Sequence, residues 1–409
     1  MAHEKFKPTI EALALQGALA TQEQQVQIKK GQHKLTIGVP VEKELQEKRI
    51  CLTPQSVGLL VNNGHEVIIE TGAGNEANFS DRDYSDKGAK IAYSSKEVFE
   101  ASTVLKVEPP TMEELEYMKS GTTLISALQM STLGPDYLAA VNKKKLVALG
   151  FELIEDKGGL KPIVRSISEI ASYSIISIAS ELLSKSGNGM GVIFGGITGV
   201  PPAKVVILGA GTIGENVARA ARAMGCSVRI FDNHHYKLRR LKKDLGQEIY
   251  TAIIDPETLK NELKDADVVI GALRSEEGTS LCVVSEEMVA AMKPNSVIID
   301  ASISQGGCFE TSRVTTHDKP TFVKHEVIHY CVPNIASRVS RTSSRALSYL
   351  WTPILLQIAR MGGVEEMMGA KPWFAKGVYS YKGYLTNEHI ARKFGVQHKD
   401  LELLLCARF

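Results

Sequence analysis

The sequence predicts an α/β protein built from two Rossmann-like, doubly wound parallel-sheet domains. Two series of short β-branched runs alternate with helical stretches, the first after residue 35 and the second after residue 203. Such alternation is typical of parallel strands joined by crossover helices. The 409 residues also suffice for two to three domains at ~150 residues each, so two separate cores are expected.

The first series begins at Leu35. Its expected strands lie in KLTIGVP, EVIIETG, TVLKVE, TTLISAL and KLVALGFEL, and TPQSVGLLVNNG is an expected helix between the first two. A long apolar helix over residues 167–183 then leads into the glycine-rich run GNGMGVIFGGITGVPPAK, which indicates a connection between domains.

The second series comprises the runs KVVILGAG, SVRIFD, ADVVIGAL and NSVIIDAS, with the helix IGENVARAARAMG after the first. After HYCVPN, the segment SRTSSRALSYLWTPILLQIARMGG predicts a helix of about six turns that is apolar along one broad face. This helix is expected to return the chain to the first domain. We therefore predict a discontinuous substrate-binding domain over 35–165 and 340–409, around a nucleotide-binding domain over 166–339.

Composition excludes several classes of function. Lys and Arg number 48 against 46 Asp and Glu, so the net charge of +2 predicts neither nucleic-acid nor membrane-surface binding, and a small ligand is the better expectation. No apolar run is long enough to span a membrane. The six cysteines are scattered without a C-x-x-C pair or a histidine cluster at zinc spacing, which predicts reduced thiols, no metal site and a cytoplasmic protein.

Residues 1–34 are expected to form an N-terminal extension. Charged and amide side chains occur throughout it, so it lacks the apolar core of an export signal. Residues 9–28 have two interpretations: a helix that packs on the body or on a neighbouring subunit, or a frayed tail.

The run VVILGAGTIG is the strongest motif in the chain. Gly209, Gly211 and Gly214 lie between a β-branched strand and an amphipathic helix, where missing side chains permit a tight turn and the approach of a pyrophosphate to the helix N-terminus. Asp232 closes the next strand, where a carboxylate binds the ribose hydroxyls and repels a 2′-phosphate. The motif therefore predicts NAD rather than NADP. Three nearby basic residues remain alternative phosphate ligands or parts of an exposed helix face: Lys237, Arg239 and Arg240.

Three segments carry a resemblance to a known family. They are IGVPVEKELQEKRICLTPQSVGLLVNNGHEVIIETGAG, GGITGVPPAKVVILGAGTIG and QGGCFETSRVTTHDKPTFVKHEVIHYCVPN. Together they resemble the alanine dehydrogenase family, which includes the NAD-binding subunit of proton-translocating transhydrogenase. The resemblance covers nearly all of the chain after Leu35, and the QGGCFE run is more similar to the alanine dehydrogenases.

The resemblance implies a two-domain subunit, usually part of a hexamer, with a cleft between the substrate domain and the NAD domain. It also implies the reversible oxidative deamination of L-alanine to pyruvate and ammonia, so the expected ligands are an amino acid or 2-oxo acid and NAD. The family's NAD contacts correspond to Ser168, Gly209, Gly211, Thr212, Ile213, Gly214, Asp232, Lys237, Arg313 and Asn334.

On the substrate side the sequence departs from the family. Arg49 matches the arginine that binds the substrate carboxylate, a task that suits the guanidinium fork. The positions of the family's lysine, histidine and aspartate are instead Glu108, Gln129 and Ser304, and Lys106 lies two residues before Glu108. Neither Gln129 nor Ser304 titrates near neutral pH, so neither suits a general base.

The acid-base chemistry is therefore assigned to Lys106 or Glu108, while Glu108 has the equal interpretation of an ion-pair partner for Arg49 or Lys106. Gln129 and Ser304 are expected to be hydrogen-bond donors to a carbonyl oxygen or satisfied core groups. Three functions stay open: an alanine-type amino-acid dehydrogenase, an imine or opine-type reductase, and a protein that binds NAD without turnover, as in the transhydrogenase branch.

Overall fold

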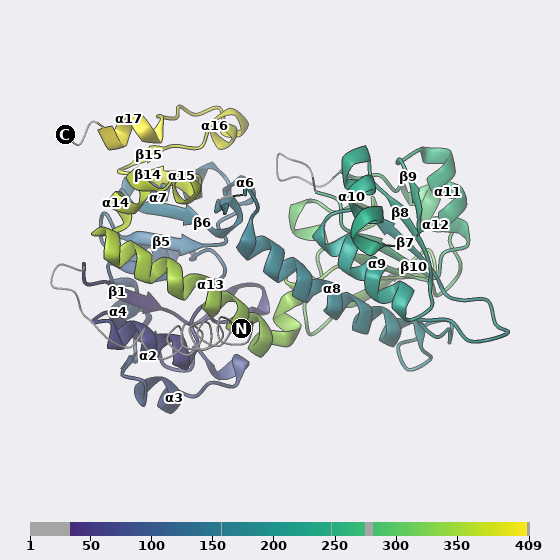
Figure 1. Ribbon diagram of the computed structural model, residues 1–409, viewed down its shortest axis with the longest axis horizontal. Helices are drawn as coiled ribbons and strands as arrows, with labels where there is room; N and C mark the ends of the chain where they lie inside the picture. The colour runs from purple at the N-terminus through teal and green to yellow at the C-terminus, as the bar shows by residue number, and fades with distance from the viewer. Residues whose placement is uncertain (1–32, 157, 247, 275–280, 407–409) are drawn as a thin grey trace, which may run out of the picture. The chain divides into compact units, whose positions relative to one another are not determined.

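The structure is a computed structural model that describes residues 33–156, 158–246, 248–274 and 281–406. Of the predicted N-terminal extension, only His33 and Lys34 fall among the described residues. The chain divides into two compact units (Figure 1). The first comprises Met1–Glu42, Arg49–Gly159 and Ser344–Phe409, and the second comprises Lys43–Lys48 and Leu160–Ser343.

The first unit is built on an eight-stranded sheet in the order β15-β14-β6-β5-β4-β1-β2-β3. Six strands are parallel to their neighbours, and β14 and β15 add an antiparallel edge. The strands are β1 (Thr36–Val39), β2 (Glu66–Glu70), β3 (Lys90–Ala92), β4 (Thr103–Leu105), β5 (Thr123–Ser126), β6 (Val147–Gly150), β14 (Val378–Tyr381) and β15 (Tyr384–Leu385).

The antiparallel pairing of β14 with β15 follows from the turn between them. Lys382 and Gly383 are the two turn residues, with φ of 51° and 89°. A two-residue turn with both φ values positive closes a hairpin, so the two strands must run in opposite directions.

Helices on both faces of this sheet bury its β-branched side chains. The longest is α13 (Ser340–Met361), the predicted return helix. Helix α2 (Pro54–Asn62) begins with a proline at its first position. The others are α3 (Asp81–Ser85), α4 (Ser95–Phe99), α5 (Met112–Tyr117), α6 (Met130–Leu133), α7 (Pro135–Lys143), α14 (Val364–Ala370), α15 (Pro372–Ala375), α16 (Glu388–Phe394) and α17 (Leu401–Cys406).

The second unit contains a seven-stranded sheet in the order β12-β13-β11-β10-β7-β8-β9. All neighbours are parallel except β12 and β13, a hairpin at the edge that closes through His325 and Glu326. The strands are β7 (Lys204–Leu208), β8 (Ser227–Phe231), β9 (Tyr250–Ala252), β10 (Val268–Gly271), β11 (Val297–Asp300), β12 (Thr321–Lys324) and β13 (Val327–Tyr330). The predicted α/β class with two sheets is confirmed, but each sheet is mixed rather than purely parallel.

Five helices flank this second sheet: α8 (Pro162–Leu183), α9 (Thr212–Ala223), α10 (His235–Leu245), α11 (Pro256–Lys264) and α12 (Glu286–Ala290). Helix α8 begins five residues before the predicted start, with Pro162 at its first position. Proline suits this position because its fixed φ is helical, and because the backbone N–H that it lacks would have no helical hydrogen-bond partner there. Ile175, Ile178 and Ala179 of α8 belong to one apolar core with Val205, Ile207 and Val217. Among the described residues, no helix combines the length and apolar character needed to cross a bilayer.

His329 of β13 is a buried histidine that gives this unit a pH-dependent stability. Its Nδ1 donates to the carbonyl of Val327 at 2.9 Å, so its Nε2 accepts from the Thr311 hydroxyl at 2.8 Å. Burial lowers the pKa of His329 from 6.5 to about 4. The folded protein therefore holds the neutral ring at pH values where the unfolded chain is protonated.

We expect the free energy of unfolding to fall as the pH decreases from about 6.5 towards 4, by up to about 1.4 kcal/mol per pH unit from this residue, because only the unfolded state gains the proton. His329→Gln removes the titrating ring and is expected to reduce this slope. Urea unfolding at several pH values measures it. Equal slopes for both proteins would contradict the assignment.

Candidate functional site

The glycine turn of the second unit joins β7 to α9. Two of its three glycines have no room for a side chain, and the other faces open space. A Cβ on Gly209, whose φ is +112°, would lie 2.4 Å from the Ala272 carbonyl oxygen, and one on Gly214 would lie 1.9 Å from the Gly209 oxygen. A Cβ on Gly211 would meet no atom within 4 Å. The first and third glycines therefore allow close packing, and the second leaves space at the N-terminus of α9, where a phosphate group is stabilised by amides and the helix dipole. These residues fit a dinucleotide.

Asp232 follows β8 and binds this turn directly. Its side chain is almost fully buried, and its Oδ2 accepts the Ala210 amide at 2.8 Å. Its Oδ1 accepts the His234 amide at 2.8 Å and lies 2.9 Å from His234 Nδ1. The carboxylate thus fixes the glycine turn relative to the second strand. The sequence analysis did not identify His234 as a partner of Asp232. The signal that could have found it is its position two residues after Asp232.

The basic residues after Asp232 have different surroundings. Arg240 donates to the Ala210 carbonyl at 3.2 Å and lies 3.8 Å from Asp244, so it supports the glycine turn from outside. The Lys237 ammonium lies 5.9 Å from the centre of the Tyr236 ring. A cavity of ≈ 350 Å³ in this unit is lined by Arg240 together with Thr212, the first residue of α9.

Three other predicted coenzyme residues lie elsewhere in the second unit. Ser168 is on α8, and its carbonyl accepts the Ser172 hydroxyl at 2.7 Å. The Arg313 guanidinium stacks 4.2 Å from the centre of the Phe322 ring. Asn334 precedes the short helix η6 (Ile335–Val339) and is buried in a polar network.

That network attaches residues 43–48 to the body of the second unit. The Asn334 amide group donates at 3.1 Å to the Leu45 carbonyl and to the Glu47 carboxylate, while its oxygen lies 3.0 Å from His317 Nε2. Burial lowers the pKa of His317. Asn334 therefore has a structural task in addition to any contact with a coenzyme.

In the first unit, Arg49 and Glu108 form a buried ion pair. The guanidinium Nη2 lies 3.5 Å from Glu108 Oε1, and both side chains are largely shielded from solvent. This pairing is one of the two interpretations that the sequence left open for Glu108. Any anion that binds Arg49 therefore encounters a carboxylate beside it.

A second buried ion pair lies next to the first. Lys106 Nζ donates to Glu42 Oε2 at 2.7 Å, and Lys106 is fully buried. Glu42 also accepts the amides of Val107 at 2.6 Å and Glu108 at 3.2 Å. Burial alone lowers the pKa of Lys106, but the carboxylates of Glu42, Glu114 and Glu108 outweigh burial and raise it.

The consequence is that Lys106 stays protonated and is unsuited to accept a proton. Glu42 was missed by sequence reasoning. The signal that could have found Glu42 is its position shortly after β1, as Lys106 comes directly after β4. The carboxyl ends of these parallel neighbours lie at the same edge of the sheet, so residues that follow them come close together.

Gln129 adopts a left-handed conformation before α6, with φ of 38° and ψ of 49°. Such a conformation costs energy for a residue with a Cβ. The backbone N–H of Gln129 donates to Glu152 Oε1 at 2.6 Å, and the Tyr379 hydroxyl donates to the same oxygen at 2.8 Å. Glu152 therefore holds this strained backbone in place and determines the course of the chain at Gln129.

Ser304 lies in the second unit, in the short helix η5 (Ile303–Gln305) after β11. The nearby Asp300 is buried and accepts the Ser302 amide at 3.0 Å, the Cys308 amide at 2.9 Å and the Ser312 hydroxyl at 2.7 Å. Burial raises the pKa of Asp300, against the effect of these hydrogen bonds. Asp300 thus shapes the turn that carries Ser304.

The structure therefore brings together two sets of the predicted residues. Gly209, Gly211, Thr212, Gly214 and Asp232 lie together at one turn of the second unit, and Arg49, Lys106 and Glu108 lie together in the first. Within the described ranges, no group of three or more His, Cys, Asp or Glu side chains is arranged to hold a metal ion.

Comparisons with known proteins extend over both units. The sequence pattern of the family Alanine dehydrogenase/PNT, N-terminal domain, matches residues 38–171, and that of Alanine dehydrogenase/PNT, C-terminal domain, matches residues 175–388. Alanine dehydrogenase 2 of Staphylococcus aureus is 35% identical over 369 residues, which are 90% of this chain and 99% of the relative.

Solved structures agree with the sequence matches. An L-alanine dehydrogenase superimposes with a TM-score of 0.81 at 32% identity, over 88% of this chain and 99% of the other. A transhydrogenase from Sinorhizobium meliloti superimposes with a TM-score of 0.72 over 86% of this chain and 99% of the other, and at 20% identity it shows the fold alone. With both family domains matched in order over almost the whole chain, this protein belongs to the alanine dehydrogenase/PNT family.

Proposed function

We propose that this protein is an NAD-dependent amino-acid dehydrogenase of the alanine type. The reaction converts L-alanine, NAD⁺ and water to pyruvate, ammonia in its ammonium form, NADH and a proton. The observation that carries the proposal is the 35% identity to alanine dehydrogenase 2 along 99% of that relative, because a match of this extent includes both the coenzyme unit and the unit that carries Arg49.

The buried pair of Arg49 and Glu108 supports an amino acid as the substrate. An α-amino acid carries a carboxylate and an ammonium group on one carbon, and here a guanidinium and a carboxylate lie 3.5 Å apart. Arg49 binds the substrate carboxylate with two parallel hydrogen bonds, and Glu108 binds the ammonium group. A 2-oxo acid offers only the negative group, so Glu108 favours the amino acid.

Glu108 is also the group that we assign to proton transfer. Lys106 is held in its charged form by Glu42 at 2.7 Å, whereas a carboxylate beside the ammonium group can accept a proton from it. Gln129 and Ser304 are assigned as hydrogen-bond donors to the carbonyl oxygen of the product. Neither side chain titrates near neutral pH, so neither is assigned to proton transfer.

In the second unit, the glycine turn, with Thr212 and Ile213 at the start of α9, is assigned to the pyrophosphate of NAD and Asp232 to the ribose hydroxyls. When bound, NAD accepts a hydride from the α-carbon of the substrate. Four further residues are proposed to contact the coenzyme: Ser168, Lys237, Arg313 and Asn334.

The direct test mixes purified protein with NAD and L-alanine and follows NADH by absorbance. We expect NADH to form, and no turnover with a panel of amino acids, or with 2-oxo acids plus ammonia, would contradict the proposal. Calorimetry separates the alternatives: heat from coenzyme binding without any turnover favours a protein that binds NAD without catalysis.

A second candidate is a reductase of imines or opine-like secondary amines. It is favoured by the negative charge of Glu108, which occupies the position of the lysine expected from the family resemblance and pairs with Arg49. Activity on a secondary amine combined with inactivity on L-alanine would select this function.

Gly211→Ala tests the coenzyme site without disturbing the fold. A Cβ there meets no protein atom within 4 Å, so we expect normal stability, but the methyl group enters the space assigned to the pyrophosphate. The dissociation constant for NADH is expected to rise at least about tenfold, which corresponds to 1.4 kcal/mol. Fluorescence titration measures it.

Gly246→Ala is the matched control for Gly211→Ala, because its Cβ also meets nothing within 4 Å and it lies after α10, away from the turn. Its positive φ makes a small loss of stability the only expected change. Equal NADH affinity in wild type and Gly211→Ala would refute the assignment.

We further propose that the protein is cytoplasmic and a homo-oligomer, with a hexamer as the expected assembly. The six free cysteines support a reducing compartment. Light scattering tests the assembly: the expected mass is six times the 44.6 kDa of one chain, and the mass of a single chain would contradict it.

A further inference from the structure

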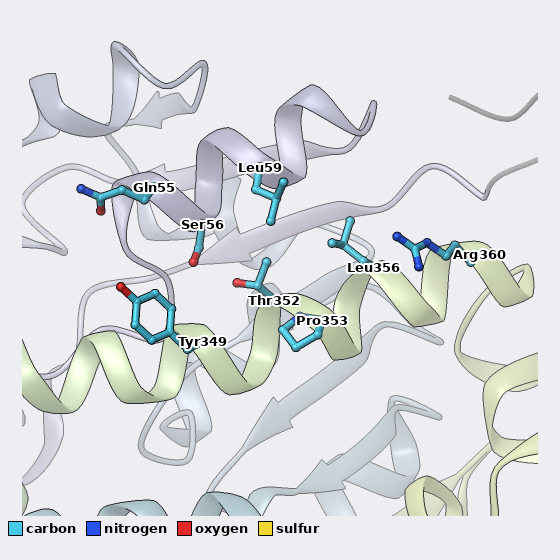
Figure 2. Close-up of a pocket in the computed structure, with 8 residues that line it drawn as sticks. All are labelled: Gln55, Ser56, Leu59, Tyr349, Thr352, Pro353, Leu356 and Arg360. Atoms are coloured by element: carbon cyan, nitrogen blue, oxygen red, sulfur yellow. The ribbon is translucent and has the colours of Figure 1, made fainter. Parts of the chain in front are cut away.

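A groove of ≈ 390 Å³ runs between α2 and α13 of the first unit (Figure 2). Leu59 and Leu356 give it an apolar floor, Tyr349 and Pro353 line it from α13, and Arg360 lies at its far end. Tyr349 is 67% exposed, although it is one of the large aromatic side chains of this unit. An exposed aromatic residue above an apolar floor is a surface that a second apolar element can cover.

The groove also offers a hydrogen-bond acceptor. Pro353 lies inside α13 and has no amide hydrogen, so the carbonyl of Tyr349, four residues earlier, cannot accept the usual helical hydrogen bond. Both residues line the groove. A partner that covers it with an amide side chain would satisfy this carbonyl.

The chain enters the described part of the first unit beside this groove. The His33 amide donates to the carbonyl of Ala359 at 3.1 Å, and Ala359 is the neighbour of Arg360, the residue at the end of the groove. Residues 1–32, which lie outside the described residues, are therefore joined covalently to a point next to it.

The sequence of residues 1–32 matches the groove in length and chemistry. In a helix, Leu15, Leu19 and Val26 fall on one face, because spacings of 4 and 11 residues return to the same side. From Leu15 to Val26 this face covers about 16 Å, and the 11 steps along the helix from Tyr349 to Arg360 cover about the same length of α13.

We propose that residues 9–28 dock as a helix in the groove between α2 and α13 of the same chain. Leu15, Leu19 and Val26 cover the apolar floor, and Val26 lies near Arg360 because only six residues separate it from His33. Gln22, which falls between Leu19 and Val26 on that face, donates its amide to the Tyr349 carbonyl. The N-terminal segment is thus an added layer of the first unit.

Hydrogen–deuterium exchange on the full-length protein tests the docking. We expect the amides of residues 9–28 to exchange at least about tenfold more slowly than those of an unstructured peptide. Tyr349→Glu introduces a charge at the apolar groove and is expected to remove this protection. Tyr93→Glu is the matched control, because Tyr93 belongs to the same unit, is 84% exposed and does not line the groove.

Unprotected amides in the wild type, or protection that survives Tyr349→Glu as well as Tyr93→Glu, would overturn the proposal. A double variant, Leu19→Cys with Tyr349→Cys, identifies which chain provides the helix. After oxidation, a cross-link within one chain supports the proposal. A covalent dimer on a denaturing gel would overturn it, since the groove would then hold the segment of a second copy.

Discussion

Arg49→Lys is expected to lower kcat/KM for L-alanine by roughly a hundredfold or more, about 2.7 kcal/mol, while the affinity for NADH stays unchanged. In the wild type, Glu108 lies 3.5 Å from the Arg49 guanidinium. A lysine keeps a positive charge beside Glu108, so the buried ion pair is retained. What is lost is the planar fork that we propose binds both oxygens of the substrate carboxylate. Steady-state kinetics with L-alanine and fluorescence titration with NADH measure the two effects.

The unchanged coenzyme affinity is the internal control for Arg49→Lys, because Arg49 belongs to the first unit and the glycine turn to the second. A hundredfold loss in both measurements would indicate a folding defect. Wild-type kcat/KM with this variant would exclude Arg49 from substrate binding.

Glu42→Gln is expected to reduce the free energy of unfolding by about 3–5 kcal/mol, since it removes one partner of a fully buried ion pair. Lys106 has no exposed surface, and Glu42 is its partner at 2.7 Å. The glutamine retains the shape of the side chain but leaves the lysine charge poorly compensated. Urea unfolding gives the free energy, and circular dichroism confirms that the variant starts from the folded state.

Glu97→Gln is the matched control, because it breaks the Lys90–Glu97 pair of the same unit, in which both side chains are more than 40% exposed. An exposed pair contributes little to stability, so its loss is expected to be small. The double variant Glu42→Gln with Lys106→Met should recover part of the stability, because it removes the buried charge that has lost its hydrogen-bonded partner. Similar losses for Glu42→Gln and Glu97→Gln would contradict the buried-pair argument.

The glycine turn shows which parts of the fold and site the sequence could predict. Gly209, Gly211, Gly214 and Asp232 are specified by local rules, since a tight turn between a strand and a helix restricts the residues within it. The expected strand, turn and helix all occur there, with β7, α9 and β8 in the predicted order. The α/β class and the family followed from the same kind of local pattern and are confirmed.

The two hairpins could not be predicted from such local patterns. Neither β12–β13 nor β14–β15 was predicted, and each makes the edge of its sheet antiparallel. Their turns, His325–Glu326 and Lys382–Gly383, have positive φ values, but only one of the four turn residues is a glycine. Local sequence signals for such turns are weak when the residues that adopt them are not glycine or asparagine.

What the sequence determined by itself is therefore the fold class, the family and the position of the glycine turn, because each depends on residues close together in the chain. Tertiary structure alone decided which ion pairs and hydrogen bonds the substrate-side residues form. Glu42 and Lys106 are 64 residues apart in the chain. Glu152 accepts hydrogen bonds from Gln129 and from Tyr379, and Tyr379 is 227 residues away from Glu152. Electrostatic effects depend on distance and burial in the folded chain, and neither quantity can be read from sequence spacing.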